Sequence, residues 1–156
     1  MYIHGSQVNK LVKNFFKHKN CVNLAILDIG SGGGANAKYL RKKGAYVYTL
    51  DKDKQFDPVF NMDIKDFKFE HKYDIILCLN VLQFLSINEI KEIVPKILNA
   101  VEDNGYLMIQ MFDSPVADWI NQQLGNFKIL DYRRWIQEDK KPYRHTHSMV
   151  SWVTKL

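Results

Sequence analysis

The residues with the clearest chemical potential form one short run, Gly30-Ser31-Gly32-Gly33-Gly34, which follows an apolar segment over 24–29. Glycines between a buried strand and a helix let the backbone approach a ligand closely. The N-terminus of the following helix adds free N–H groups and partial positive charge. The spacing Gly30-x-Gly32-x-x-Ala35 also satisfies the dinucleotide fingerprint, so the loop by itself leaves a nicotinamide cofactor open as an alternative.

Three aspartates stand where they can bind the polar groups of a nucleoside-like ligand. Asp28 lies inside the first apolar segment, where a buried carboxylate is costly unless it meets a donor, and where nicotinamide-binding strands usually carry an apolar residue. Asp51 ends the next strand-like segment and can accept hydrogen bonds from both hydroxyls of a ribose. Asp63 ends a third segment and can accept from an adenine amino group, while Met62 and Ile64 sandwich the ring.

Alternating strands and helices are expected to position these residues. The first half of the chain predicts an amphipathic helix over 6–19, strands over 24–29 and 45–50, a helix over 35–43, a brief strand over 58–62 and a strand over 73–79. The second half predicts a helix that starts at a capping box formed by Ser86 and Glu89, a turn over 103–105, a strand over 106–112, a short helix over 119–124, and strands over 127–136 and 148–154. This rhythm is typical of a parallel α/β sheet, with an antiparallel hairpin on one edge.

Four motifs in order resemble those of class I S-adenosylmethionine-dependent methyltransferases. Residues 27–34 resemble the first motif of that family, whose usual form is Asp/Glu-x-Gly-x-Gly-x-Gly. Asp51 matches the family's ribose-binding acid, Asp63 its adenine-binding acid, and residues 73–85 its fourth motif. The resemblance spans about 24–112. It departs from the pattern at Ser31, where many members have Cys, and at Asn104-Gly105, where Pro-Gly-Gly is more usual.

The resemblance implies a Rossmann-like α/β fold. Its sheet would have seven mostly parallel strands with an antiparallel last strand, and helices on both faces. It also implies S-adenosylmethionine as cofactor and S-adenosylhomocysteine as product, with the cofactor across the carboxyl ends of the first strands. The cofactor-binding residues it implies are Asp28, Gly30, Ser31, Gly32, Gly34, Asp51, Lys52, Met62, Asp63, Ile64, Asn80 and Val81, the last two near the methionine portion. No metal is expected, because the sequence has no Cys and His residues at a spacing typical of zinc ligands.

The C-terminal segment is similar to the tellurite-resistance type of small-molecule methyltransferase. That subgroup uses His and Arg near this point to orient or deprotonate a substrate, which makes Arg144, His145 and His147 the catalytic candidates. Alternate residues of a strand face the same side, so both histidines could point at the pocket or both could face solvent. Which of the two corresponds to the catalytic residue stays open.

The length and the charge of the chain bear on its domain organisation and its partners. The 156 residues are expected to form one methyltransferase domain: an N-terminal helix over 1–20, a cofactor-binding core over 24–112, and a substrate-side loop and terminal hairpin over 113–156. The formal charge is +5, but only four of the 22 basic residues are arginine. A scattered lysine surplus favours a solvated surface over nucleic-acid binding, which stays a minor alternative.

Location and assembly are also expectations from the sequence. No apolar run approaches the ~18 residues of a membrane span, and no signal-like segment opens the sequence. The two cysteines cannot form a disulfide framework. We therefore expect a cytoplasmic protein that does not bind membranes and is a monomer or a homodimer.

The family resemblance implies methyl transfer from S-adenosylmethionine, and we expect a small-molecule nucleophile to receive the methyl group by in-line displacement. Two other readings stay open, namely an RNA or protein methyltransferase and a non-catalytic methyltransferase-like binding module. The Asn-Pro-Pro-Tyr signature of amino-group methylation on nucleobases is absent, because the fourth strand ends in Leu79-Asn80-Val81-Leu82.

Overall fold

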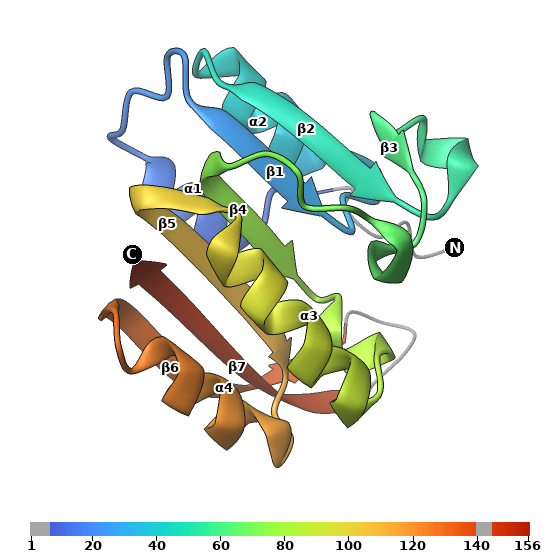
Figure 1. Ribbon diagram of the computed structural model, residues 1–156, viewed down its shortest axis with the longest axis vertical. Coiled ribbons are helices and arrows are strands. Elements are labelled where there is room, and N and C mark those ends of the chain that lie inside the picture. The colour runs from blue at the N-terminus through green and yellow to red at the C-terminus, as the bar shows by residue number, and fades with distance from the viewer. Residues whose placement is uncertain (1–6, 140–144) are drawn as a thin grey trace.

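A seven-stranded sheet forms the centre of the computed structural model, which describes residues 7–139 and 145–156 (Figure 1). The strands are β1 (Ala25–Ile29), β2 (Tyr46–Asp51), β3 (Phe60–Asn61), β4 (Tyr73–Leu79), β5 (Val101–Phe112), β6 (Lys128–Glu138) and β7 (Thr146–Lys155). Their order is β3-β2-β1-β4-β5-β7-β6. β1 to β5 pair in parallel, whereas β7 runs antiparallel to both β5 and β6. The predicted sheet and its terminal hairpin are confirmed.

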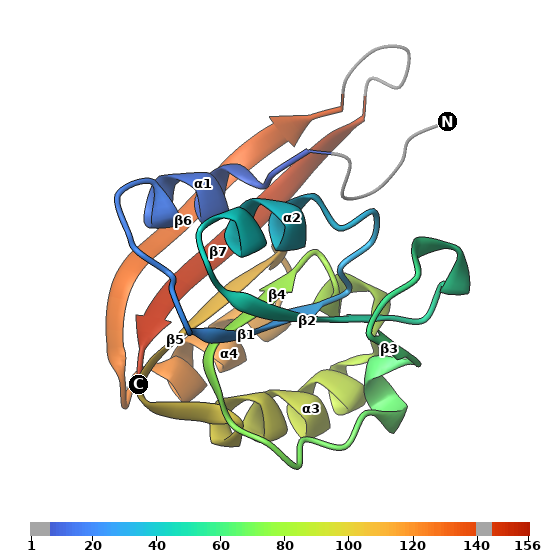
Figure 2. The ribbon, with the colours of Figure 1, turned by 90° about the horizontal axis from the view of Figure 1, so that it is seen from above.

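Helices cover both faces of this sheet, as predicted (Figure 2). α1 (Lys10–Phe16) and α2 (Ala35–Lys42) pack on one face, where their buried side chains join those of β1 and β4 in one apolar cluster. α3 (Ile87–Asn99) and α4 (Val116–Leu124) pack on the other face, in a second cluster that includes the fully buried Trp152 of β7. Over the described parts of the chain, none of the helices has the length and apolar character needed to span a membrane.

The structure differs from the sequence-based elements at several boundaries. The predicted turn over 103–105 is wrong, because these residues lie within β5. Asn104 adopts a left-handed φ of 64°, and the pairing of β4 with β5 shifts register between Tyr73 and Ile75, so the chain bends without leaving the sheet. The first helix begins later than expected, because Asn9 caps it, and it ends earlier, at Phe16. The third strand contracts to two residues.

The ends of the strands create the space for a ligand. β1, β2 and β4 end at the same edge of the sheet, and the glycine loop follows β1 there. At this edge β5 stops at Phe112, which pairs with Met149, whereas the pairing of β6 with β7 continues as far as Glu138 and Thr146. The hairpin therefore projects beyond the rest of the sheet (Figure 2).

The predicted capping box at the start of α3 is present. The Ser86 amide N–H donates to Glu89 Oε1 at 2.9 Å, and the Glu89 amide N–H donates to Ser86 Oγ at 3.2 Å. These bonds satisfy N–H groups that a helix start otherwise leaves unpaired.

Replacing Ser86→Ala should lower the free energy of unfolding by about 1 kcal/mol, because a cap oxygen is lost. Thermal denaturation should show a midpoint lower by roughly 2–4 °C. Ser148→Ala is the matched control, since Ser148 is exposed and the described residues offer its hydroxyl no hydrogen bond. Equal midpoint shifts for the two variants would show that the box does not stabilise α3.

Candidate cofactor-binding and active site

The glycine loop is fastened to the end of β2. The amide N–H groups of Gly30 and Ser31 both donate to the Leu50 carbonyl oxygen, at 2.7 and 3.1 Å. Gly30 has a φ of +66°, in the left-handed region that favours glycine, and a Cβ at this position would clash with the Val81 side chain. Glycine therefore allows the loop after β1 to lie directly against the segment after β4.

Asp51 holds the next part of this loop. Its Oδ2 accepts from the Gly32 amide at 2.8 Å, and its Oδ1 accepts from the Asp53 amide at 2.9 Å. Two backbone donors thus fix the carboxylate at the end of β2. A carboxylate offers about four acceptor sites, so it can still accept from two neighbouring hydroxyls.

Asp63 is anchored in a similar way beyond β3. Its Oδ1 accepts from the Lys65 amide at 2.9 Å and caps the short 3₁₀ helix η2 (Ile64–Asp66). Met62 is exposed beside it, and Ile64 is buried. This arrangement combines a carboxylate with apolar side chains, as an aromatic base requires.

Nearly all of the predicted cofactor-binding residues surround one cavity of about 1100 Å³. The predicted residues that line it are Asp28, Gly30, Ser31, Gly32, Asp51, Lys52, Met62, Asp63, Ile64, Asn80 and Val81. Gly34 is the exception, because it lies on the other side of the loop, at the start of α2. The cavity spans the strand ends at the edge that the topology predicts.

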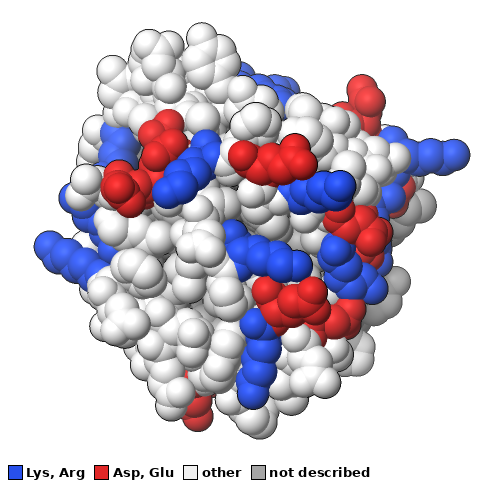
Figure 3. All heavy atoms as spheres, viewed as in Figure 1, with Lys and Arg blue, Asp and Glu red and all other residues white. Residues whose placement is uncertain are grey.

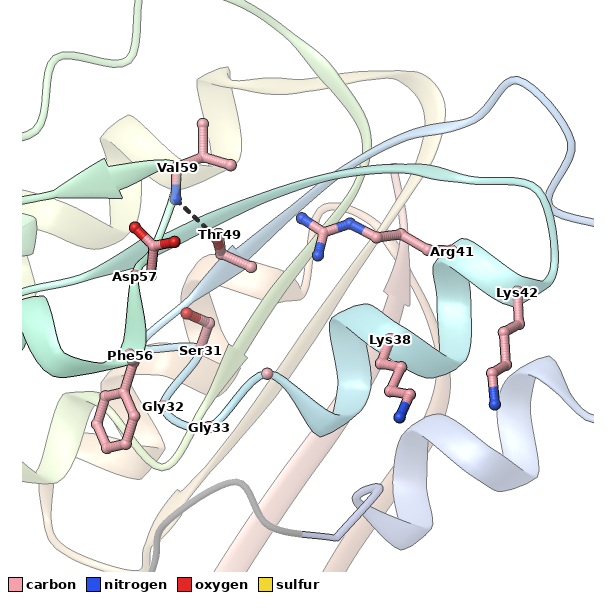
Figure 4. A pocket seen from close by; sticks show the side chains of 11 residues that line it. Ser31, Gly32, Gly33, Lys38, Arg41, Lys42, Thr49, Phe56, Asp57 and Val59 are labelled. Carbon is pink, nitrogen blue, oxygen red and sulfur yellow. Dashed lines mark hydrogen bonds between the residues drawn. The ribbon is translucent and has the colours of Figure 1, made fainter.

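A second hollow of about 570 Å³ lies on that other side of the loop (Figure 4). Its basic side chains do not converge on a point: Lys38 and Lys42 lie along α2, away from Thr49 and Val59 (Figure 4). The guanidinium of Arg41 donates from Nη2 to the Val47 carbonyl oxygen at 2.7 Å. This hollow offers an exposed basic wall, and the convergent carboxylates are in the larger cavity.

Asp28 is the most unusual group of the larger cavity. It is 2% exposed, and its Oδ2 has no hydrogen-bond partner among the described residues. Burial raises the pKa of its carboxyl to about 7, the negative charge of Asp51 adds to the rise, and Arg41 opposes it. A carboxyl in this state gains most from a ligand that brings a positive charge or a donor.

The sequence placed a terminal hairpin on the substrate side, but the individual hairpin residues that line the far wall of the cavity were not predicted. Trp135, Ile136 and Asp139 of the hairpin segment line it, together with Phe84 of the 3₁₀ helix η3 (Leu82–Phe84), which is 72% exposed. Gln110 also lines the cavity. It is the only amide side chain in the apolar segment over 106–112, and such a polar residue in a buried strand could have marked it as a candidate site residue. No local pattern marks Asp139, because the strand register brings it to the cavity.

The two candidate histidines have different surroundings. His147 lies with its Nε2 3.2 Å from Asp139 Oδ2, and its ring stacks on Phe112 with 4.7 Å between centroids. His145 is exposed, and its carbonyl oxygen accepts from the Asp139 amide at 2.8 Å. Asp139 itself lines the cavity, whereas neither histidine is among the lining residues. The third candidate, Arg144, lies outside the described residues.

The raised pKa of Asp28 predicts a pH-dependent cost to the ligand-free protein. The unfolded chain ionises Asp28 near its ordinary pKa of 3.8, but the folded protein holds the proton up to about pH 7. Stability should therefore fall as the pH rises from about 4 to 7. Asp28→Asn removes this loss, so the variant's melting temperature should exceed that of the wild type by several degrees more at pH 8 than at pH 5.

Asp103→Asn provides the control, because Asp103 is an exposed carboxylate in β5. Its melting temperature should differ from the wild type by the same amount at both pH values. A difference for Asp28→Asn that does not grow with pH would contradict the assigned protonation of Asp28.

Comparison with known proteins gives one family and many similar folds. Residues 5–153 match the family model described as methyltransferase domain. No curated protein matches the chain. Similar solved structures include TehB from Haemophilus influenzae, with a TM-score of 0.82 at 18% identity over 95% of this chain and 62% of that one. The chain thus spans less than two thirds of the TehB chain.

Two further structures were determined with ligands bound. Magnesium protoporphyrin IX methyltransferase (ChlM) from Synechocystis PCC 6803, with bound S-adenosylmethionine, has a TM-score of 0.65 at 21% identity over 92% of this chain and 76% of its own. N-methyltransferase NodS from Bradyrhizobium japonicum WM9, in complex with S-adenosylhomocysteine, has a TM-score of 0.72 at 12% identity over 94% and 83%. These likenesses show the fold. Since the family match covers almost all of the sequence, the chain belongs to the methyltransferase domain family.

Proposed function

We propose that this protein binds S-adenosylmethionine in the larger cavity and transfers its methyl group to a small-molecule nucleophile. The observation that carries the proposal is the convergence of Asp28, Asp51 and Asp63 on one cavity beside the glycine loop. Each carboxylate has a complementary group on the cofactor, and the family membership supplies the reaction class.

The adenosine end fits the region beside β2 and β3. Asp51 is already held by the amides of Gly32 and Asp53, so it can accept both ribose hydroxyls without rearrangement. Asp63 can accept the adenine amino group, with Met62 and Ile64 against the ring faces. Preorganised acceptors of this kind reduce the entropy cost of binding.

The methionine end fits the region around Asp28. The cofactor's ammonium group supplies a donor and a positive charge to this buried carboxyl, whose Oδ2 has no hydrogen-bond partner in the described part of the chain. When bound, S-adenosylmethionine supplies a methyl group already activated by the positive sulfur. The protein mainly has to align the acceptor at about 3 Å from that methyl group.

The acceptor end then lies toward the hairpin. Phe84 and Trp135 offer aromatic surface there, and Asp139 offers a carboxylate. For an acceptor that carries a proton, Asp139 can take that proton as the methyl group passes from the sulfur to the acceptor's lone pair, which leaves S-adenosylhomocysteine. His147 Nε2 lies 3.2 Å from Asp139 Oδ2, but His147 does not line the cavity, so we assign His147 the role of positioning the Asp139 carboxylate.

Two observations support a small acceptor over a nucleic acid. The segment before α1 and the hairpin both contribute residues to the wall of the cavity. On the face seen in Figure 3, basic side chains are interleaved with acidic ones, whereas nucleic-acid binding favours a continuous basic surface.

Cofactor binding is tested first by thermal shift. S-adenosylmethionine and S-adenosylhomocysteine should raise the melting temperature, and NAD should not. Asp51→Ala should weaken S-adenosylhomocysteine affinity by about 10-fold or more, because hydrogen bonds to a charged group contribute roughly 1.5–3 kcal/mol. Asp103→Ala should leave this affinity unchanged. Stabilisation by NAD alone would refute the proposed cofactor, and unchanged affinity in Asp51→Ala would move the ribose site elsewhere.

Turnover tests the acceptor end. Release of S-adenosylhomocysteine should be measured against a panel of thiols, oxyanions, small amines and short RNAs. With a proton-bearing acceptor from the panel, His147→Ala should lower kcat by about 10-fold or more, without changing S-adenosylhomocysteine affinity. His145→Ala is the matched control and should have little effect, because its ring is exposed. Equal losses in both variants would contradict the role assigned to His147, and turnover of the short RNAs alone would contradict a small-molecule acceptor.

A further inference from the structure

Three side-chain amides form a continuous chain of hydrogen bonds at the cavity. Asn9, just before α1, donates from Nδ2 to Gln110 Oε1 at 3.3 Å. Gln110, in β5, donates from Nε2 to Asn80 Oδ1 at 3.2 Å. All three residues line the cavity, and Gln110 is only 6% exposed. This partly buried amide chain links the segment before α1 to the end of β4.

The direction of this chain is fixed at its outer end by the backbone. The Leu11 amide N–H donates to Asn9 Oδ1 at 2.8 Å, and a backbone amide N–H can only donate. Asn9 must therefore turn its Nδ2 toward Gln110. Gln110 accepts with its oxygen and donates with its nitrogen, so Asn80 accepts in turn.

Asn80 is consequently left with a donor facing the cavity. The described residues offer no partner to its Nδ2. The backbone of Asn80 is held in place as well, since its amide N–H donates to the Gln110 carbonyl oxygen at 2.7 Å and its φ is 60°. The position and the polarity of this carboxamide are thus both set before any ligand arrives.

The neighbouring strand presents the opposite polarity. β1 and β4 are adjacent, and Asp28 pairs with Leu77, three residues before Asn80. The cavity therefore holds a carboxyl that suits a cation and an amide N–H that suits an anion. An α-amino acid end carries both an ammonium and a carboxylate, so this pair matches the methionine end of the proposed cofactor.

We propose that Asn9 and Gln110 are positioning residues that fix the amide of Asn80 so that its N–H groups donate to the carboxylate of the cofactor's amino-acid end. This inference rests on the proposed function. The segment before α1 then acts on the ligand through two intervening hydrogen bonds, in addition to forming part of the cavity wall.

Asn9→Asp tests the polarity directly. An aspartate still caps α1 by accepting from the Leu11 amide, so the fold should be retained. The carboxylate of this aspartate cannot donate to Gln110. The Gln110 amide therefore turns over, so that its Nε2 donates to the new carboxylate and its oxygen faces Asn80. Asn80 then donates to Gln110 and turns its own oxygen toward the cavity, where it repels a carboxylate.

Two matched variants separate this reversal from simpler effects. Asn36→Asp adds the same charge to the same cavity, and its Oδ1 can still accept from the Asn9 amide, as Asn36 does at 2.8 Å. It therefore measures the electrostatic effect of the charge alone. Asn9→Ser keeps a cap but releases Gln110 without reversing it, so its effect should be intermediate.

The readout is affinity measured by calorimetry with two probes, S-adenosylhomocysteine and 5′-methylthioadenosine, which lacks the amino-acid end. Asn9→Asp should weaken S-adenosylhomocysteine binding by about 10-fold or more beyond the effect of Asn36→Asp, because an acceptor replaces a donor to a charged group. Binding of 5′-methylthioadenosine should be the same in both variants. Gln110→Glu, checked for folding by its melting temperature, should reproduce the selective loss, because an ionised carboxylate also accepts from Asn80.

Three results would overturn the inference or its basis. Equal S-adenosylhomocysteine affinities for Asn9→Asp and Asn36→Asp would refute the proposal that Asn9 and Gln110 set the orientation of the Asn80 amide. An equal loss for both probes in Asn9→Asp would show a general effect on the cavity, and would also refute it. A wild-type protein that binds neither probe would refute the proposed function itself, which distinguishes the two failures.

Discussion

The site depends on the fastening of the loop after β1 to the end of β2. One carbonyl, that of Leu50, accepts from both Gly30 and Ser31, and the Asp51 carboxylate accepts from Gly32. Only a residue without a Cβ fits beside Val81 with the left-handed φ of Gly30. The hydrogen bond from Gly32 that holds the loop also fixes the orientation of the Asp51 carboxylate. The loop conformation and the proposed ribose acceptor are therefore established together.

Local patterns predicted the parts of the molecule that local physics determines. Continuous apolar runs indicated β1 and β4, and Ser86 with Glu89 marked the start of α3, because neither signal needs distant contacts. Asp103-Asn104-Gly105 misled because a left-handed Asn suits a bulge as well as a turn. Gln110 and Asp139 reach the cavity only through strand register, which depends on pairing across the whole sheet.

The cavity is a place where stability is given up. Asp28 is buried, its Oδ2 has no partner within residues 7–139 and 145–156, and Asn80 holds a left-handed backbone conformation. The surrounding structure compensates through two apolar clusters, one on each face of the sheet. A ligand that supplies the missing charge and the missing acceptor would relieve this cost, so binding and folding are thermodynamically linked.

The β6–β7 hairpin carries a separate consequence. It projects beyond β5, and its contribution to the cavity wall comes from the end of β6 and the residue after it. The residues proposed for the cofactor come instead from the carboxyl ends of β1 and β2 and from the segments after β1, β2, β3 and β4. The wall that we propose for the acceptor is thus encoded in one contiguous stretch of sequence, which can diverge while the residues proposed for the cofactor stay constant. For an engineer, this makes residues 135–139 a natural cassette to exchange when the proposed acceptor side is varied.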